Sequence, residues 1–177
     1  MSHLTEPEDV QLLCSLFSPE ELLLTQCLQE LEGLFGPADW VSRPLLFDRT
    51  RFYEREMGWP LHRRFVTFRE LIRPDALVGA KIRTQRLEER YTQEGKRRVN
   101  VDPGYLSLER LVLATGKNYT HRIYLSKGIY ADLTLVFQRG TFRGLEWTYR
   151  DYASPEMIEV FNGIRERYKE RLRGIRD

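Results

Sequence analysis

Apolar residues recur first with the period of a strand and then with the period of a helix. Residues 10–16 carry an apolar side chain at every second position, which is typical of a half-buried strand. The sequence Ser18-Pro19-Glu20-Glu21 is typical of a helix capping box, and Gly36-Pro37 is typical of a helix end. Between these signals, four apolar residues share one helix face: Leu24, Leu28, Leu31 and Phe35. The sequence therefore predicts a strand followed by an amphipathic helix.

The middle of the chain predicts further strands and one helix. Three stretches have an extended pattern: residues 39–47, 64–71 and 97–101. Pro74-Asp75 begins a helical stretch that runs to about Gln93, and Gly95 follows as its terminator. Alternating apolar residues from Val78 to Ile82 also fit a strand, so both interpretations stay open there. The tripeptide Asp102-Pro103-Gly104 predicts a tight turn after the strand at 97–101.

The last part of the chain predicts two helices separated by a β-meander. Ser107 is expected to cap a short helix that runs through Thr115. Three extended stretches follow, joined by short glycine-containing turns: residues 119–125, 129–137 and 141–147. Ser154-Pro155 then begins a closing helix. The predicted fold class is α+β, with a mostly antiparallel sheet, a loosely ferredoxin-like core, a C-terminal β-meander and a closing helix. Because no linker or repeat interrupts it, we expect one globular domain over residues 1–177, with residues 1–9 as a flexible N-terminus.

Composition narrows the setting in which the chain works. No apolar run approaches the ~20 residues that cross a bilayer, and residues 1–9 are polar and acidic, unlike a signal peptide. The two cysteines, Cys14 and Cys27, fit neither a disulfide framework nor a metal site. We therefore expect a cytoplasmic protein with no membrane partner. The net charge is +2, but residues 1–48 carry −8 and residues 49–177 carry +10. The basic part would attract an anionic partner, or the two parts attract each other in the folded chain.

Several motifs with well-defined chemistry are missing. Gly116-Lys117-Asn118 lacks the earlier glycine and the hydroxyl residue of a phosphate-binding loop. Neither the dinucleotide-binding motif G-x-G-x-x-G nor the nucleophile elbow G-x-S-x-G is present. The three histidines lie far apart in sequence, so the sequence predicts no metal site. It indicates no particular cofactor. P-loop nucleotide hydrolysis and Rossmann-type dinucleotide binding are therefore not expected.

The strongest candidate for a ligand site is the predicted strand, turn and helix at residues 98–107. Unpaired backbone amides at the helix N-terminus would bind an anion, with two arginines beside them. Asn100 and Asp102 are two residues apart, so they share one face of the strand, and Asp102 would orient a substrate hydroxyl or act as a base. The alternative is that Asp102 only closes the turn by bonding its own backbone. The ligand-binding residues predicted here are Arg97, Arg98, Asn100, Gly104, Tyr105 and Ser107.

A second polar group is predicted on neighbouring strands of the meander. Tyr130 and Asp132 are two residues apart and share the polar face of their strand. Cross-strand pairing would bring His121 or Arg122 near Asp132. A pair of His121 and Asp132 could transfer protons, whereas the alternative is an ordinary surface ion pair. The candidate catalytic residues are therefore Asp102, His121 and Asp132, and Arg122 and Tyr130 are predicted to bind ligand.

Residues 49–73 are basic and aromatic and suggest another function. Arginines are interleaved there with Phe, Tyr and Trp, as on surfaces that neutralise phosphates and stack on bases. One alternative is therefore an RNA-associated binding module, although interleaved glutamates reduce the net charge of this segment to +4. Another is a protein-interaction or scaffold domain with no catalytic site. We favour a cytoplasmic domain that binds a small phosphorylated or nucleotide-like ligand, and whether it is an enzyme stays open.

Four groups of residues are distinctive in combination: Asp48 to Gly58 (DRTRFYEREMG), Arg98 to Leu106 (RVNVDPGYL), Leu111 to Lys117 (LVLATGK), and His121 to Leu125 (HRIYL) with Gly128 to Leu135 (GIYADLTL). With them the chain resembles a prokaryotic family of similar length that is catalogued as a domain of unknown function, some of whose members carry the label GTP-binding protein. The resemblance implies no activity or substrate. It places the family's polar motif residues at Asp48, Tyr53, Glu54, Asn100, Asp102, Tyr105, His121, Arg122, Tyr130 and Asp132. Asp48 and Tyr53 thereby join the predicted ligand-binding residues.

Overall fold

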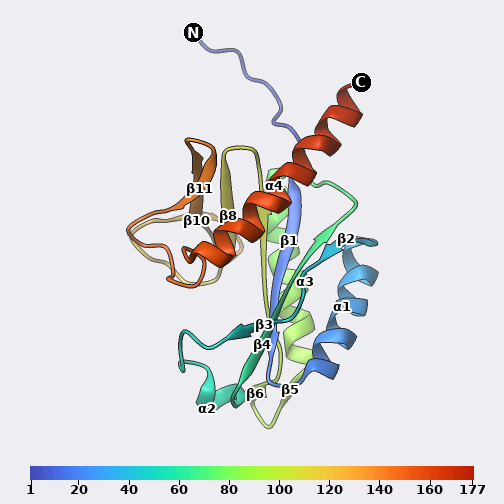
Figure 1. Ribbon diagram of the computed structural model, residues 1–177, viewed down its shortest axis with the longest axis vertical. Coiled ribbons are helices and arrows are strands. Elements are labelled where there is room, and N and C mark those ends of the chain that lie inside the picture. The colour runs from blue at the N-terminus through green and yellow to red at the C-terminus, as the bar shows by residue number, and fades with distance from the viewer.

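The computed structural model describes residues 1–177, whose strands form one large sheet with helices on both faces (Figure 1). The strands are β1 (Gln11–Ser18), β2 (Ala38–Val41), β3 (Leu45–Phe47), β4 (Leu61–Phe68), β5 (Thr92–Gln93), β6 (Lys96–Arg97), β7 (Asn100–Leu106), β8 (Arg110–Thr115), β9 (Arg122–Ser126), β10 (Ile129–Gln138) and β11 (Thr141–Gly144). The helices are α1 (Glu21–Phe35), α2 (Glu54–Met57), α3 (Leu77–Arg90), which follows a 3-10 turn at Pro74–Ala76, and α4 (Pro155–Arg176). Strands β5 and β6 pair only with each other.

The main sheet is antiparallel throughout. Its order is β11-β10-β8-β7-β1-β4-β2, with β3 also paired to β4 and β9 also paired to β10. Within it, β7-β1-β4-β2 has the arrangement of a ferredoxin-like β-α-β-β-α-β unit, whose two helices are α1 and α3. Strands β8, β10 and β11 extend the sheet beyond β7. The predicted α+β class is confirmed, and so are the mostly antiparallel sheet and the closing helix.

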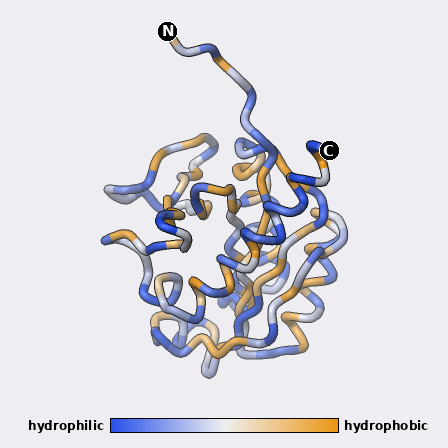
Figure 2. The backbone as a smooth tube through the Cα atoms, turned by 45° about the horizontal axis from the view of Figure 1, so that its top comes forward, coloured by the Kyte–Doolittle hydropathy of each residue, from blue (hydrophilic) through white to orange (hydrophobic).

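The helices cover the sheet from two sides. Leu24 and Leu31 of α1 and Leu87 of α3 pack with Leu12 and Val66 of the sheet in one core cluster. Helix α4 lies across the opposite face (Figure 1). Because each helix packs on the sheet along one side only, hydrophobic and hydrophilic stretches alternate along the helices in Figure 2.

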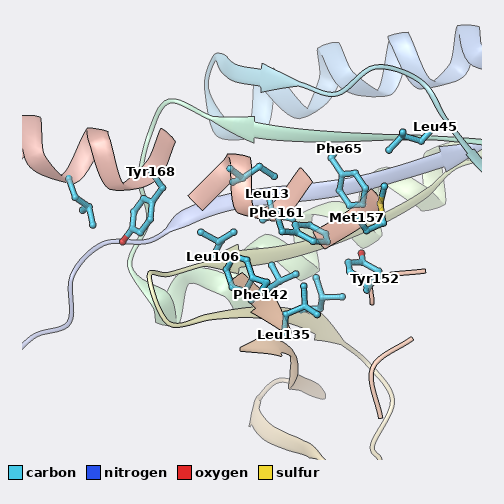
Figure 3. Close-up of a cluster of buried hydrophobic side chains, with 14 residues drawn as sticks. Leu13, Leu45, Phe65, Leu106, Leu135, Phe142, Tyr152, Met157, Phe161 and Tyr168 are labelled. Carbon is cyan, nitrogen blue, oxygen red and sulfur yellow. The ribbon is translucent and has the colours of Figure 1, made fainter. Parts of the chain in front are cut away.

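The core under α4 is rich in aromatic rings. Phe161 of α4 stacks on Tyr152, with ring centroids 5.6 Å apart, and meets Phe65 of β4 edge-on at 5.3 Å (Figure 3). The helix begins as predicted, because the Ser154 side chain accepts a hydrogen bond from the backbone N–H of Met157. This packing fixes the chain immediately before α4 against the sheet.

The helix predicted from Ser107 to Thr115 is wrong: Ser107 lies in a hairpin turn, and Arg110–Thr115 form strand β8. Leu111 and Leu113 pack under α4, while Val112 and Ala114 pack on the other face beside α3. The strand is therefore buried on both faces, and its continuous apolar run has no alternation that would distinguish it from a buried helix. Ser107 closes the hairpin between β7 and β8 by accepting hydrogen bonds from the backbone N–H groups of Glu109 and Arg110.

The tripeptide Asp102-Pro103-Gly104 lies inside strand β7, and the turn predicted there is also wrong. Asp102 is paired with Ser15 of β1, and Pro103 with Cys14. Strand β8 pairs with β7 only from Gly104 onward, so the proline marks the place where these two strands separate. The predicted strand–turn–helix at 98–107 therefore does not exist, and no helix N-terminus is available there to bind an anion.

Other boundaries differ in smaller ways. The predicted capping box is wrong: Ser18 belongs to β1 and its hydroxyl donates to the Arg98 carbonyl, while α1 begins without a side-chain cap. The strand predicted over residues 39–47 is split into β2 and β3. Residues 78–82, where two interpretations were open, are helical and belong to α3.

The first nine residues form no helix or strand and extend away from the sheet (Figure 1). No helix of the chain combines the length and the apolar content that crossing a membrane requires. Cys14 and Cys27 are free and buried. Burial raises the pKa of the Cys27 thiol to about 12 and that of Cys14 further, so both stay protonated.

Candidate functional site

The sheet face under α4 changes from apolar to polar along its strands. Leu13 of β1 and Leu106 of β7 belong to the core beneath the helix. Side chains two and four residues further along a strand point to the same face. Phe17 lies four residues from Leu13 in β1, and Asp102 lies four residues from Leu106 in β7. Both line a cavity of about 910 Å³, which lies beside the residues that precede α4. The polar face is therefore a hollow that α4 leaves uncovered.

The cavity forms where β7 and β8 separate. The two strands pair between Gly104 and Leu106, and the register ends at Gly104 opposite Leu113. Beyond that point Asp102 of β7 and Thr115 of β8 line the cavity from either side, and Lys81 of α3 lines it as well. The split in the sheet thus brings polar groups from β7, β8 and α3 together.

Charged groups of both signs line the cavity. The basic residues are Arg49, Arg63, Lys81, Arg97, Lys117, Arg122 and Arg150, and the acidic ones are Glu88, Glu89, Asp102, Asp132 and Asp151. Most of the inner charges are paired with each other, as buried charges must be. The pairing falls into three groups.

The first group is a chain of bonds that ends on Asp102. Arg97 donates to Glu56 at 2.7 Å, to Glu88 at 2.9 Å and to the Asn100 side-chain oxygen at 2.8 Å. The Asn100 side-chain N–H then donates to Asp102 Oδ2 at 2.7 Å. Because Arg97 can only donate, it fixes the orientation of the Asn100 amide, which in turn fixes the Asp102 carboxylate.

The pKa values of the two glutamates that bind Arg97 are shifted in opposite directions. The hydrogen bond from Arg97 lowers the pKa of Glu56 below its ordinary value. Desolvation of the buried Glu88 raises its pKa instead, and this outweighs the attraction of Lys81 and Arg97. Ionised Glu56 therefore stabilises the fold, whereas ionised Glu88 is costly to bury.

Glu56→Gln is expected to lower the free energy of unfolding at pH 7 by about 1 kcal/mol or less, because Glu56 is partly exposed. A carboxyl with a lowered folded pKa stabilises above its unfolded pKa and loses this effect as the pH falls. The difference between wild type and variant should therefore shrink from pH 7 to pH 3 in urea titrations. Glu88→Gln is the control, with unchanged or higher stability at pH 7; a loss larger than that of Glu56→Gln would contradict this assignment.

The second group surrounds Arg63 of β4. Its Nη1 donates to Asp151 at 2.6 Å, and both side chains are largely buried. The guanidinium also lies over the rings of Phe47, at 4.4 Å, and Tyr152, at 5.3 Å. The aromatic rings and Asp151 therefore hold a buried cation at the wall of the cavity.

The third group is centred on Asp132 of β10. Its Oδ2 accepts from Arg122 Nε at 2.9 Å and lies 3.2 Å from His121 Nε2. The His121 ring stacks on Trp147, with centroids 5.0 Å apart, and Arg122 also donates to the Tyr149 hydroxyl at 3.2 Å. Arg122 and Asp132 line the cavity, whereas His121 contacts Asp132 but does not line the cavity. The predicted proximity of His121 and Arg122 to Asp132 is therefore present, and Asp132 orients Arg122 at the cavity.

The rim of the cavity differs from its interior. Arg49, Lys117 and Arg150 are exposed there and have no carboxylate within salt-bridge distance. Two exposed aromatic rings, Phe52 and Tyr149, stand among them. Glu89 is also exposed and unpaired there, so the exposed charges at the cavity sum to +2, and the rim is positively charged and aromatic.

The structure brings part of the predicted site together. Residues that line the cavity are Tyr53, Arg97, Asn100, Asp102, Arg122 and Asp132, with His121 in contact with Asp132. Tyr53 packs edge-on against Phe17, and burial raises its pKa to about 12, so its hydroxyl keeps its proton.

The other predicted residues lie elsewhere. Arg98 pairs with Glu20 on the surface, Ser107 closes a hairpin at the far end of β7, and Gly104 packs against β8. Tyr105 packs with the core cluster beside α3, and Tyr130 packs edge-on against Tyr124 of β9. None of these five residues lines the cavity, and neither does the exposed Asp48.

Sequence reasoning missed several residues of the site. Lys81 and Glu88 belong to α3, and Glu88 lies on its buried side with Leu87 and Thr84. A charged residue on the buried side of a helix was the signal that could have found Glu88. Asp151 and Tyr152 belong to an aromatic cluster that only the position of α4 directs to the cavity. The single signal for Arg63 was its place at alternate positions with Phe65 in a basic and aromatic segment.

Comparison with known proteins identifies the family of the chain and gives no activity for it. No curated protein and no solved structure gives a match to the chain. A family model described as a domain of unknown function, DUF4416, matches residues 8–168. This range includes every residue of the three charged groups around the cavity. The chain therefore belongs to the DUF4416 family, as its sequence strings led us to expect.

Proposed function

We propose that the protein binds a small phosphorylated, nucleotide-like ligand in the cavity between β7 and β8. The observation that carries this proposal is the rim, where Arg49, Lys117 and Arg150 line the cavity and none of them forms a salt bridge. Three unpaired cations against one unpaired carboxylate, Glu89, give the exposed lining of the cavity a net positive charge, which attracts an anion. A phosphate group meets this need with several acceptor oxygens.

Size and aromatic content support the same ligand class. A cavity of about 910 Å³ is within the range of sites that bury a whole small molecule. Phe52 and Tyr149 are exposed at the rim, where their rings are available to stack on a planar group. The phosphate would be held by side chains, and not by backbone amides near Ser107.

The RNA alternative has less support. Arg51 pairs with Glu54, Arg63 is buried with Asp151, and Arg73 pairs with Glu6 and Asp75. Arginines engaged within the protein are not available to neutralise a phosphate backbone. We infer that the ligand is small, and that the protein works in the reducing cytoplasm, where its two free cysteines remain thiols.

Calorimetric titration with inorganic phosphate, pyrophosphate, ribose 5-phosphate, AMP and GMP tests the proposal. We expect at least one of them to bind with a Kd below about 1 mM, and more weakly at higher salt. Replacing Arg49, Lys117 and Arg150 together by glutamine should weaken that binding about tenfold or more.

The control is the triple variant Arg69→Gln, Arg139→Gln and Arg173→Gln, which removes the same charge from exposed positions outside the cavity. It should change the Kd less than about twofold. The proposal is wrong if none of the five compounds binds, or if both triple variants weaken binding equally.

A further inference from the structure

We propose that the inner wall of the cavity recognises a vicinal diol, so that the ligand is a phosphorylated sugar or nucleoside with two free neighbouring hydroxyl groups. This inference rests on the proposed function and adds the class of ligand. The residues concerned are Asp102, Arg63 and Tyr152, which we call the inner wall; all three line the cavity.

Asp102 supplies a fixed acceptor. Its Oδ2 is occupied by the Asn100 amide, which Arg97 holds in place. Its Oδ1 has no hydrogen bond: the nearest cation, Lys81 Nζ, is 3.9 Å away. About one third of the Asp102 side chain is exposed, and the group lines the cavity. A carboxylate oxygen held in position with free lone pairs is a good acceptor for a ligand hydroxyl.

Arg63 and Tyr152 supply donors on the same wall. Arg63 Nε and the Tyr152 hydroxyl are buried and make no hydrogen bond in the protein. Only about 4% of either residue is exposed. Buried polar groups are almost always bonded, so two unpartnered donors on one cavity wall call for an explanation. A ligand that accepts hydrogen bonds at this wall provides one.

The Ser15 hydroxyl extends this group of donors. Ser15 lies directly opposite Asp102 in the pairing of β1 with β7, and it is fully buried. It stands near the Tyr152 hydroxyl, although no hydrogen bond of good geometry joins the two. If the two hydroxyls rotated to bond each other, one of their two protons would still be free to donate. The wall therefore keeps spare donors in either arrangement.

These groups match a diol better than a phosphate. Each hydroxyl of a diol both donates and accepts, so a pair of them can donate to Asp102 Oδ1 and accept from Arg63 and Tyr152. Phosphate would face the carboxylates of Asp102 and Asp151 at this wall and be repelled. Phe17 and Phe47 give the adjoining surface an apolar face for the carbon side of a sugar ring. The ligand is thus oriented with its phosphate at the rim and its diol inside.

Paired titrations test the diol directly. Ribose 5-phosphate is compared with 2-deoxyribose 5-phosphate, and AMP with 2′-deoxy-AMP. We expect the hydroxylated member of each pair to bind at least about tenfold more tightly. The deoxy analogue lacks one hydroxyl of the diol and leaves polar groups of the inner wall unpaired. Asp102→Asn should reduce the affinity for the hydroxylated member to that of the deoxy analogue, while the Kd of the deoxy analogue changes less than about twofold.

A second variant protects the test against misfolding. Tyr152→Phe removes a hydroxyl that makes no hydrogen bond of good geometry in the protein, so the variant should still fold while diol binding weakens about threefold or more. If phosphorylated compounds bind but neither pair shows a preference, the diol inference is overturned and the proposed function stands. If no phosphorylated compound binds, both are overturned.

Discussion

Replacing Arg63 with methionine is expected to lower the free energy of unfolding by about 3–5 kcal/mol. Arg63 is 4% exposed and its only charged partner is Asp151, whose side chain is 15% exposed. Removing the guanidinium leaves a carboxylate that has lost its solvation and its counter-ion together. Methionine fills a similar volume among the surrounding rings, so the loss measures the charge and not a large void.

The aromatic surroundings make this loss larger than that of a surface ion pair. The guanidinium lies within 6 Å of the centroids of Phe17, Phe47, Phe65 and Tyr152. Rings of this kind attract a cation most strongly when water is excluded. They offer nothing equivalent to an unpaired carboxylate, because the negative face of a ring repels it.

Urea unfolding followed by circular dichroism measures this effect, with two further variants as references. Adding Asp151→Asn to Arg63→Met should recover about half of the loss or more, since the uncompensated charge is gone. Arg69→Met, at an exposed arginine with no side-chain partner, should stay within about 0.5 kcal/mol of wild type. A loss below 1 kcal/mol for Arg63→Met would show that the pair does not stabilise the wall of the cavity.

The elements that could be predicted from the sequence are those whose apolar residues recur with the period of a strand or of a helix. An apolar side chain recurs at every second position from Val10 to Leu16, which predicted β1 although the strand is buried on both faces. Helices α1 and α4 carry an apolar stripe at helical spacing. The meander of β9, β10 and β11 is separated by turns with glycine at positive φ, such as Gly128 and Gly140. These local signals were sufficient for the fold class.

The failures occurred where packing overrides local chemistry. Strand β8 is apolar on both faces, so its sequence has no periodicity to read. The Pro-Gly pair in β7 is usually a turn signal, but here Gly104 is needed by the neighbouring strand and Pro103 marks a split in the sheet. Neither fact is visible without knowing that β7 lies between β1 and β8.

The site was predicted in part for a similar reason. Asn100 and Asp102 were paired from their spacing along one strand, and Arg122 was placed near Asp132 from cross-strand pairing. Arg63, Lys81 and Tyr152 come from three other parts of the chain. Only the tertiary fold brings them to the same cavity, so no spacing rule could have found them.

Gly104 illustrates the difference between a binding residue and a packing residue. A Cβ added there would lie 2.7 Å from the Leu113 side chain and 2.7 Å from the Val112 backbone oxygen. Such contacts are closer than real Cβ atoms make, and a backbone oxygen in the middle of a sheet cannot move aside without breaking the pairing of β7 with β8. The glycine is therefore required for close approach of two central strands.

Gly104→Ala is accordingly expected to lower the free energy of unfolding by about 3 kcal/mol, measured by urea unfolding. Gly79→Ala is the matched control, because nothing lies within 4 Å of a Cβ at that position of α3 and alanine favours the helix. That variant should be more stable than wild type by about 0.5–1 kcal/mol. If Gly104→Ala instead kept full stability and only weakened ligand binding, Gly104 would belong to the binding site after all, and the close contact between β7 and β8 would have to be relieved by a shift of β8.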